Sequence, residues 1–159
     1  AQGGIFVPAD SFSFQPADCI YTHFPADEDK TMDLGRLGEE CRRFRQIYSD
    51  STKNSLLLLN ETFSTTSFEE GYFIAKDAVR AILSKGVRTI YNTHMHKLAF
   101  ELEELNRPYD AVKAVSLIVK ADGGNRSFKI AMAPPEGMSY AGDIARKYGV
   151  TYEMLVEHI

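Results

Sequence analysis

Two apolar stretches of the chain each end in a polar group that can take part in chemistry. Four consecutive leucines within Ser55–Asn60 are followed by Glu61, and the apolar stretch Thr89–Thr93 is followed by His94. A carboxylate held at the end of a strand is well placed to polarise a water molecule beside a bound phosphate. Because a second titratable residue, His94, ends the next apolar stretch, the pattern predicts a catalytic arrangement of these two side chains.

The elements that must position Glu61 and His94 are two strands and the segment between them. Leu56–Leu59 has neither the period of a surface helix nor that of a half-exposed strand, so it predicts a strand buried on both faces at the centre of a parallel sheet. Phe68–Lys85 follows hydroxyl residues that favour a helix start, and Gly86 favours its end. If this helix is the crossover between the two strands, Glu61 and His94 lie at the same edge of the sheet.

Simpler interpretations of these residues remain open. An acidic residue after a hydrophobic strand is common, so Glu61 alone does not define a nucleotide site. His94 and His96 would share one face of a strand and could bind a metal together, but the sequence has no third or fourth ligand nearby. His94 could also be a structural histidine, and His96 fits the start of a helix that continues through Leu105.

Further elements are predicted around this pair of strands. The apolar face of the helix at 68–85 is assigned mainly to Phe73, Ala75, Val79, Ile82 and Leu83. Before the two strands, the sequence predicts a short strand at Ile5–Val7 stopped by Pro8, an edge strand within Asp18–Phe24, and a helix from Leu34 to about Tyr48 with Leu37, Cys41 and Phe44 on one face. After them, it predicts a β-hairpin of Ala114–Val119 and Phe128–Met132 around Gly123–Gly124. Two helices are predicted last, at Tyr140–Lys147 and Tyr152–His158, joined at Gly149. This order of elements indicates an α/β fold.

The composition limits the classes of protein to which the chain can belong. Its 159 residues, 44% of them hydrophobic and 25% charged, are typical of one globular domain. The net charge of −4 and the pI near 5.6 argue against an overall electrostatic attraction to nucleic acid. Cys19 and Cys41 lack the spacing of metal ligands and predict reduced thiols in a cytoplasmic protein. No apolar stretch approaches the roughly 20 residues that cross a bilayer, so no membrane contact is expected.

The chain resembles a known family of ATPases over most of its length. The segments SLLLLNE, TFSTTSFEEG and TIYNTHMHKLA resemble the Walker B strand, the loop after it and the histidine switch of the MutS mismatch-repair ATPases. The further matching segments are Gly4–Ala9, Asp18–Thr22, Ser139–Tyr140 and Ile144–Ala145, in the same order and at nearly the same spacing. The resemblance implies an α/β P-loop NTPase of the ATP-binding-cassette type, with residues 1–159 as the C-terminal portion of a single ATPase domain.

The resemblance also implies roles at the two strand ends, with ATP and magnesium as the ligands. Glu61 matches the general base or water-orienting residue, and His94 matches the sensor of the γ-phosphate. Asn60 matches the residue that holds magnesium through its water shell, where the family usually has aspartate. Because asparagine keeps an acceptor oxygen but lacks the negative charge, a lower magnesium affinity is expected.

Other positions of the family's site differ in this chain. Gly35 stands where a serine at a helix start reaches the γ-phosphate bound by the partner subunit. Its amide can still donate to an anion, and Arg36 could add positive charge, so both are candidate nucleotide-binding residues. A third candidate is Ser64, which replaces an arginine in the loop after the glutamate. Phe63 and Thr65 replace glycines of that loop, which is therefore expected to be stiffer.

The phosphate-binding loop of the resembled family has the pattern G-x-x-x-x-G-K-[ST], and this pattern occurs nowhere in the 159 residues. In that family the loop lies upstream of the matching region. Without its backbone amides and lysine, the β- and γ-phosphates lose their main ligands. The chain by itself is therefore expected to bind ATP poorly and to hydrolyse none.

The resemblance implies that the intact protein couples ATP binding and hydrolysis to the clamping of DNA by a dimer, as a MutS-like mismatch-repair ATPase or a divergent paralogue. The expected partners are DNA, through domains outside these residues, a second copy that completes composite ATP sites, and downstream repair proteins. An alternative is a nucleotide-gated dimerisation module with little or no turnover, which Asn60 and the altered loop after Glu61 favour and which Glu61 and His94 oppose. A chromosome-structuring or recombination ATPase is disfavoured by the threonine-serine loop and the Thr-His-x-His ending.

Overall fold

The structure is a computed structural model, and it describes residues 2–25, 35–122, 125–135 and 141–156. The chain divides into two compact units, Ala1–Ser116 and Leu117–Ile159, and each is described by itself. Two expectations lie outside the described residues: the turn at Gly123–Gly124 and the resembling segment Ser139–Tyr140.

The first unit contains a parallel sheet of three strands. In the described residues the strands are β1 (Ile20–His23), β2 (Leu56–Asn60) and β3 (Arg88–Asn92), in the order β1-β2-β3. Leu58 of β2 pairs with Thr22 of β1 and with Ile90 of β3, and both pairings are parallel. The predictions that the leucine run forms the central strand and that 18–24 contains an edge strand are therefore confirmed.

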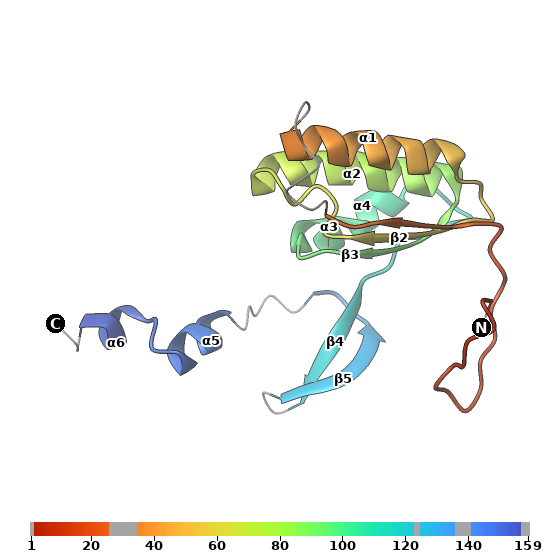
Figure 1. Cartoon of the computed structure of the whole chain (residues 1–159). Coiled ribbons are helices and arrows are strands. Elements are labelled where there is room, and N and C mark those ends of the chain that lie inside the picture. The colour runs from red at the N-terminus through yellow and green to blue at the C-terminus, as the bar shows by residue number, and fades with distance from the viewer. Residues whose placement is uncertain (1, 26–34, 123–124, 136–140, 157–159) are drawn as a thin grey trace. The chain divides into compact units, whose positions relative to one another are not determined.

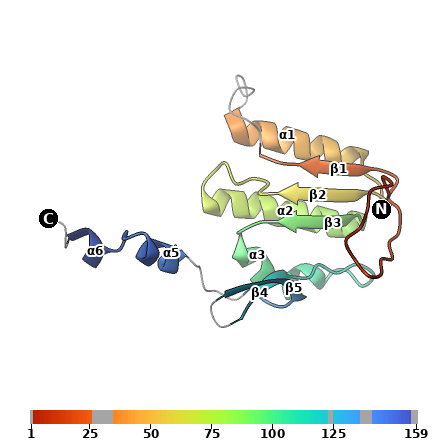
Figure 2. The same cartoon turned by 60° about the horizontal axis from the view of Figure 1, so that its bottom comes forward.

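Two long helices connect these strands and cover one face of the sheet (Figures 1 and 2). They are α1 (Gly35–Asp50), between β1 and β2, and α2 (Phe68–Lys85), between β2 and β3. Because the strand order follows the chain, two crossovers of the same hand place their helices on the same face. Leu57 and Leu59 are buried on β2, whereas Leu56 and Leu58 are only half-buried. Burial of this strand on both faces, which the leucine run predicted, is thus not seen in the described residues.

Helix α2 begins and ends at the residues that the sequence predicted. The side chain of Ser67 accepts a hydrogen bond from the backbone N–H of Glu70, and two glutamates lie in the first turn, where they complement the helix dipole. At the other end, the N–H of Gly86 donates to the carbonyl oxygens of Ile82 and Leu83. These local signals explain why the bounds of this helix could be read from the sequence.

The buried face of α2 differs in part from the predicted one. Phe73, which was assigned to the apolar face, is 64% exposed. The neighbouring Tyr72 is buried instead, with Ala75, Ile82 and Leu83 as predicted and with Gly71 and Ala78 in addition. Successive residues of a helix point about 100° apart, so a shift of one position moves a side chain from the core to the surface. The small residues Gly71, Ala75 and Ala78 let the helix lie close to its neighbours.

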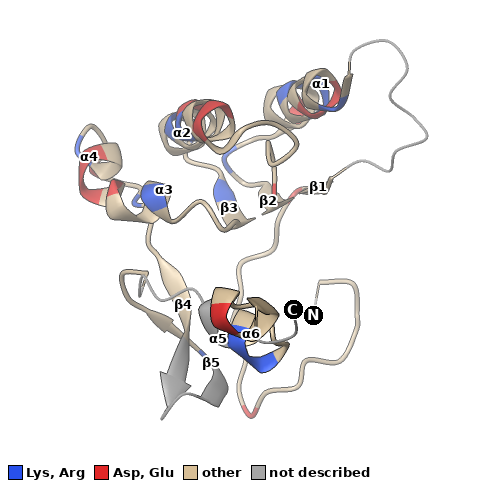
Figure 3. Cartoon of the chain, turned by 90° about the vertical axis from the view of Figure 1, so that its left-hand side faces the viewer, with Lys and Arg blue, Asp and Glu red and all other residues tan. Residues whose placement is uncertain are grey.

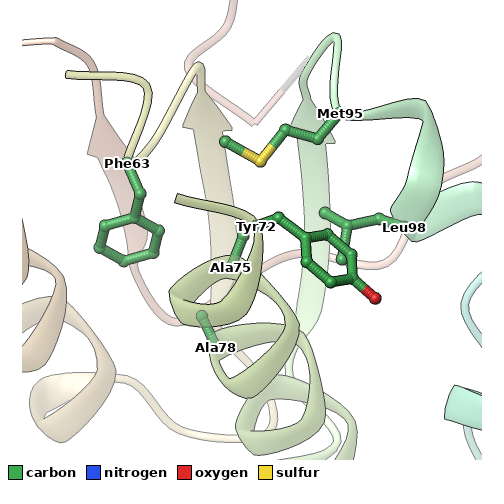
Figure 4. Packing of buried hydrophobic residues seen from close by; sticks show 6 residues of the cluster. All are labelled: Phe63, Tyr72, Ala75, Ala78, Met95 and Leu98. Carbon is green, nitrogen blue, oxygen red and sulfur yellow. The ribbon is translucent and has the colours of Figure 1, made fainter. Parts of the chain in front are cut away.

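Six buried residues form the core cluster that lies beside the strand ends. Figure 4 shows Phe63, Tyr72, Ala75, Ala78, Met95 and Leu98, which come from the loop after β2, from α2 and from the region after β3. Leu37, Cys41 and Phe44 of α1 pack against this cluster, which confirms the predicted apolar face of that helix.

The region after β3 forms two short helices rather than one. Helix α3 (His96–Phe100) begins at His96 as predicted, but it stops at Glu101, and α4 (Leu102–Asn106) follows. The carboxylate of Glu101 accepts hydrogen bonds from the Tyr72 hydroxyl and, at 2.7 Å, from Lys76 Nζ. These contacts attach the junction of α3 and α4 to α2.

The N-terminal segment differs from its prediction. Residues 5–7 do not form a strand, and the side chain of Phe6 is 97% exposed. Pro8 lacks a backbone donor and cannot take part in a ladder of hydrogen bonds. The segment is attached instead through Gln2, whose side-chain amide accepts from the N–H of Ala17 at 2.9 Å and donates to the carbonyl oxygen of the same residue at 2.7 Å.

The second unit contains a hairpin and two short helices. Strands β4 (Leu117–Asp122) and β5 (Asn125–Met132) pair in the antiparallel direction, with Leu117 opposite Met132. Helices α5 (Ala141–Lys147) and α6 (Tyr152–Val156) follow, with Gly149 between them. The described parts of these elements confirm the predicted hairpin and pair of helices.

Charges of both signs are distributed along the two long helices of the first unit (Figure 3). Arg42 pairs with Glu39 on α1 at 2.9 Å, and Arg80 pairs with Asp77 on α2 at 3.3 Å. Neither helix therefore carries charge of one sign only. Within the described residues, no helix combines the length and the apolar character needed to cross a bilayer.

Gly71 lies where α2 approaches the loop after β2 and the loop after β3. The small distance between these elements leads to a testable prediction. A Cβ atom at this position would lie 2.5 Å from the carbonyl oxygen of Phe63 and 3.2 Å from the terminal methyl of Met95. Alanine normally stabilises a helix interior by up to about 1 kcal/mol relative to glycine. Because the clash is with backbone, we expect Gly71→Ala to lower the free energy of unfolding by about 1–3 kcal/mol. Urea denaturation followed by circular dichroism measures the change.

The matched control is Gly3→Ala, because a Cβ atom there meets nothing within 4 Å. This variant is expected to unfold at the same urea concentration as the unmodified chain. A Gly71→Ala variant that is as stable as the control would contradict the close packing of the Phe63 carbonyl on α2.

Candidate active site

Glu61 and His94 are brought into contact at the carboxyl ends of neighbouring strands. Glu61 follows β2 directly, and His94 is the second residue after β3. Nδ1 of His94 lies 2.7 Å from Oε2 of Glu61. The His94 side chain is 67% exposed, and that of Glu61 is 27% exposed. The expectation that the two side chains share one edge of the sheet is therefore confirmed, although their chemical roles stay predictions.

The backbone holds the two strand ends together as far as Glu61. The N–H of Glu61 donates to the carbonyl oxygen of Asn92 at 2.9 Å, which extends the hydrogen bonding between β2 and β3 by one residue. One residue earlier, Asn60 Oδ1 accepts a hydrogen bond from Asn92 Nδ2 at 2.7 Å. The amide of Asn92 thus orients the side chain that was predicted to face magnesium.

The loop after β2 has an unusual backbone. Glu61 and Phe63 have φ angles of 49° and 67°, in the left-handed region that non-glycine residues seldom adopt. Such a conformation costs about 1–3 kcal/mol and persists only where the surroundings hold it. The ring of Phe63 is buried and packs edge-on against Phe44 of α1, with ring centroids 5.4 Å apart. This packing holds a phenylalanine in a backbone conformation that glycine adopts without strain.

A buried polar network lies beneath this loop. Thr62 Oγ1 lies 3.0 Å from His23 Nδ1, and His23 Nε2 lies 3.2 Å from the backbone carbonyl oxygen of Glu40. A carbonyl oxygen only accepts, so Nε2 carries the proton and Nδ1 accepts from the Thr62 hydroxyl. The side chain of Glu40 completes the network, because its Oε2 accepts from Thr65 Oγ1 at 3.1 Å. The network joins β1, α1 and the loop that carries Glu61.

Burial shifts the pKa values of the two ionisable members of the network. His23 and Glu40 are both fully shielded from solvent. Desolvation lowers the pKa of His23 and raises the pKa of Glu40, because burial disfavours the charged form of each. The neutral imidazole is consistent with the hydrogen-bonding directions of His23. The sequence interpretation missed both residues, although His23 ends β1 just as polar residues end β2 and β3.

The remaining predicted residues lie on two different elements. Ser64 belongs to the loop after β2, where its N–H donates to the carbonyl oxygen of Glu61 at 3.2 Å. Gly35 and Arg36 are exposed and begin α1. Gly35 has a φ angle of 66°, a conformation in which a residue with a side chain would be strained. Of the predicted site residues, Asn60, Glu61, Ser64 and His94 therefore lie at the strand ends and in the loop after β2, whereas Gly35 and Arg36 lie at the start of α1.

The acceptor atoms at the strand ends fit a ligand that supplies its own donors. Oε2 of Glu61 is shielded from solvent and accepts no hydrogen bond of regular geometry in the described structure, although the His94 ring lies against it. Asn60 Oδ1 uses one of its two lone pairs to accept from Asn92. The described residues contain no group of three His, Cys, Asp or Glu side chains placed to hold a metal ion. Asn60 and Glu61 fit contacts made through water better than direct metal ligation.

An α/β fold with a carboxylate and an imidazole in contact at its strand ends defines a broad class of proteins, which includes many hydrolases and nucleotide-binding proteins. Comparisons with known proteins identify the family within this class. The family described as MutS domain V matches residues 1–157. The chain therefore belongs to the MutS domain V family.

Relatives of known name agree with this assignment. The chain is 34% identical over 158 residues to the DNA mismatch repair protein MutS of Methanococcoides burtonii, with 97% of this chain and 17% of the relative covered. It is 31% identical to the protein of the same name from Halothermothrix orenii, with 98% and 17% covered. It is 26% identical to the Endonuclease MutS2 of Thermus thermophilus, with 98% and 20% covered. The chain thus spans about one-sixth to one-fifth of the length of these relatives.

The strained backbone at Phe63 can be tested by comparing two truncations. Phe63→Ala removes the buried ring and is expected to lower the free energy of unfolding by about 3–5 kcal/mol. Phe63→Gly removes the same ring but adopts a positive φ without strain. We therefore expect the glycine variant to be at least as stable as the alanine variant in urea denaturation.

The control pair is Leu105→Ala and Leu105→Gly, at a buried helical position of α4. There the glycine variant is expected to be less stable by about 1 kcal/mol, because glycine disfavours a helix. The same penalty for glycine at both positions would show that the backbone at Phe63 is not strained.

The raised pKa of Glu40 predicts a pH dependence of stability. Because burial raises this pKa above its ordinary value of 4.5, the folded chain binds a proton more readily than the unfolded chain. The contribution of Glu40 to the free energy of unfolding therefore falls as the pH rises from about 4.5 through the folded-state pKa, and is constant above it. We expect the stability of Glu40→Gln relative to the unmodified chain to increase over this window, as measured by urea denaturation at several pH values.

Glu39 provides a control of opposite sign. The Arg42 guanidinium lowers the pKa of Glu39, so its stabilising contribution is lost as the pH falls through the lowered folded-state pKa. The relative stability of Glu39→Gln is expected to decrease slightly as the pH rises. A difference between Glu40→Gln and the unmodified chain that stays constant with pH would contradict the buried carboxyl.

Proposed function

We propose that this chain is the C-terminal part of the ATP-binding domain of a MutS-like DNA mismatch-repair ATPase. The observation that carries the proposal is the 2.7 Å contact between Glu61 and His94 at the carboxyl ends of β2 and β3. Ligands of open α/β sheets bind outside this edge. Membership of the MutS domain V family and the names of the relatives support a role in mismatch repair.

Glu61 is the general base or water-orienting residue of the proposed site. Bound ATP supplies the phosphoanhydride bond, and magnesium neutralises charge on its phosphates. The Glu61 side chain is 27% exposed and Oε2 accepts no hydrogen bond of regular geometry, so the carboxylate has acceptor capacity with which to orient a water and take up its proton as the water attacks. The positive φ of Glu61 turns the chain at the strand end, where the carboxylate must face the ligand.

His94 is the sensor of the γ-phosphate. Its Nδ1 lies against the Glu61 carboxylate, and two-thirds of its side chain is exposed. With both ring nitrogens protonated, Nδ1 donates to Glu61 and Nε2 can donate to a phosphate oxygen. The contact with Glu61 links the presence of that phosphate to the position of the base. Asn60 holds a water of the magnesium shell, and its hydrogen bond with Asn92 fixes the direction of its oxygen.

The site is completed by a second copy of the protein. Gly35 and Arg36 begin α1 and are exposed, as residues that reach a partner's nucleotide must be. The amide of Gly35 donates to the γ-phosphate across the interface, and Arg36 adds positive charge. Ser64 belongs to the loop beside the protein's own nucleotide. The homodimer clamps DNA through domains outside these residues. ATP binding and hydrolysis open and close this clamp and control its interaction with downstream repair proteins.

A nucleotide-gated module with little or no turnover is the second candidate. The observation that favours it is the neutral side chain of Asn60, whose oxygen already accepts a hydrogen bond from Asn92. An amide in this place attracts magnesium less than a carboxylate does. In this alternative the dimer closes on ATP and opens on its release, and Glu61 has no chemical step to perform.

The two candidates differ in steady-state hydrolysis by the full-length protein. For the proposed ATPase, we expect Glu61→Gln to lower kcat by at least about 100-fold, because the general base is lost, and to leave ATP binding in place. His94→Ala is expected to lower kcat as well. Phosphate release measures turnover, and a fluorescent ATP analogue measures binding.

The control variant is Glu103→Gln, which changes an exposed carboxylate on α4. It is expected to hydrolyse ATP at the unmodified rate, and the 159-residue chain alone is expected to hydrolyse none. A full-length protein that binds ATP but turns over no faster than its Glu61→Gln variant would replace the ATPase by the nucleotide-gated module.

A further inference from the structure

Helix α1 places an ionisable residue in the core that the proposed mechanism does not use. Glu40 is fully shielded from solvent, unlike its neighbour Glu39, which pairs with Arg42 near the surface. A buried carboxyl is costly unless its polar atoms find partners. An apolar side chain of similar size would fill the same space without that cost. The contacts of Glu40 therefore indicate what the polar group contributes.

Glu40 is linked to the loop after β2 through its side chain directly and through its backbone carbonyl by way of His23. Its side-chain Oε2 accepts a hydrogen bond from Thr65 Oγ1 at 3.1 Å, whereas the buried Oε1 has no hydrogen-bond partner among the described residues. Its backbone carbonyl accepts from His23 Nε2, and the other ring nitrogen of His23 accepts from the Thr62 hydroxyl. Two residues of the loop after Glu61, Thr62 and Thr65, are thus linked to β1 and α1.

The held loop is the part of the site that needs support. Glu61 and Phe63 both have a positive φ, a conformation that the chain would leave if nothing opposed it. The ring of Phe63 supplies an apolar contact with α1, and the carboxyl of Glu40 supplies the polar contact on the same helix. A side chain that acts in catalysis must be held to within a fraction of an ångström, and this depends on its supporting shell.

We propose that Glu40 is a positioning residue for hydrolysis, which holds the loop of Glu61 in place through the hydroxyl of Thr65. The inference rests on the proposed function, because Glu61 must be the residue that acts on water. Glu40 lies five residues after Gly35 on the same helix. The helix that offers its start to the partner's nucleotide therefore also fixes the carboxylate that serves the protein's own nucleotide.

The test compares Glu40→Met with Glu40→Gln in the full-length protein. The methionine fills the space without an acceptor, whereas the glutamine keeps an acceptor for the Thr65 hydroxyl. We expect Glu40→Met to lower kcat by about 10- to 100-fold, because a misplacement of about 1 Å has an effect of this size. The dissociation constant for ATP is expected to stay within about threefold, and Glu40→Gln recovers most of the lost rate.

Two further variants separate positioning from a general loss of structure. Thr65→Val removes the same hydrogen bond from the other side, and its combination with Glu40→Met is expected to lose no more rate than Glu40→Met alone. Glu39→Met changes the neighbouring carboxylate on α1, which is half-buried and pairs with Arg42, and is expected to retain the unmodified kcat. Hydrogen exchange of the amides at 62–66 is expected to be about tenfold faster in Glu40→Met and unchanged in Glu39→Met.

Each outcome decides for or against the inference. The inference is overturned if a folded Glu40→Met variant has the unmodified kcat. It is also overturned if Glu40→Met loses both ATP affinity and rate and Glu40→Gln shows the same losses. If the unmodified protein binds ATP without turnover, the proposed function fails, but hydrogen exchange still tests the contact. Unchanged exchange at 62–66 in Glu40→Met would then show that Glu40 does not hold the loop.

Discussion

The burial of the Phe63 ring is the contact on which the candidate site depends. The backbone at this residue has a positive φ, and its buried ring packs against Phe44 of α1. The Phe63 carbonyl in turn lies so close to α2 that no side chain fits at Gly71. One residue therefore brings together the loop after β2 and both helices, and it fixes the direction in which the chain leaves Glu61.

The same loop is held by polar contacts that a hydrophobic core would not need. Thr62 contacts His23 of β1, and Thr65 contacts Glu40 of α1. The ring of His23 also contacts the backbone of Glu40, so the contacts connect β1, α1 and the loop. Apolar packing resists separation of the elements but allows sliding, whereas directed hydrogen bonds also fix the register. The loop is consequently held in two ways, by the ring of Phe63 and by the network beneath it.

Local signals and long-range packing were not equally predictable. The bounds of α2 followed from Ser67 and Gly86, because caps act within one turn. The placement of Glu61 and His94 at one edge of the sheet followed from the helical crossover between two parallel strands. The burial of Tyr72 in place of Phe73 depends on how α2 is rotated against its neighbours, which periodicity alone does not settle. The contact between His23 and Glu40 joins elements that are distant in sequence, and no motif marks it.

The charges at the strand ends explain why positioning matters in this chain. Asn60 is neutral and already accepts a hydrogen bond from Asn92, so Glu61 is the carboxylate that the end of β2 presents. A site with less negative charge repels a nucleotide less, but it also holds magnesium less firmly. If the site acts as proposed, stabilisation that magnesium supplies less strongly comes from accurate placement of the Glu61 carboxylate and the attacking water. In the proposed ATPase, the neutral side chain of Asn60 beside Glu61 therefore makes turnover more dependent on the contacts that hold the loop of Glu61 in place.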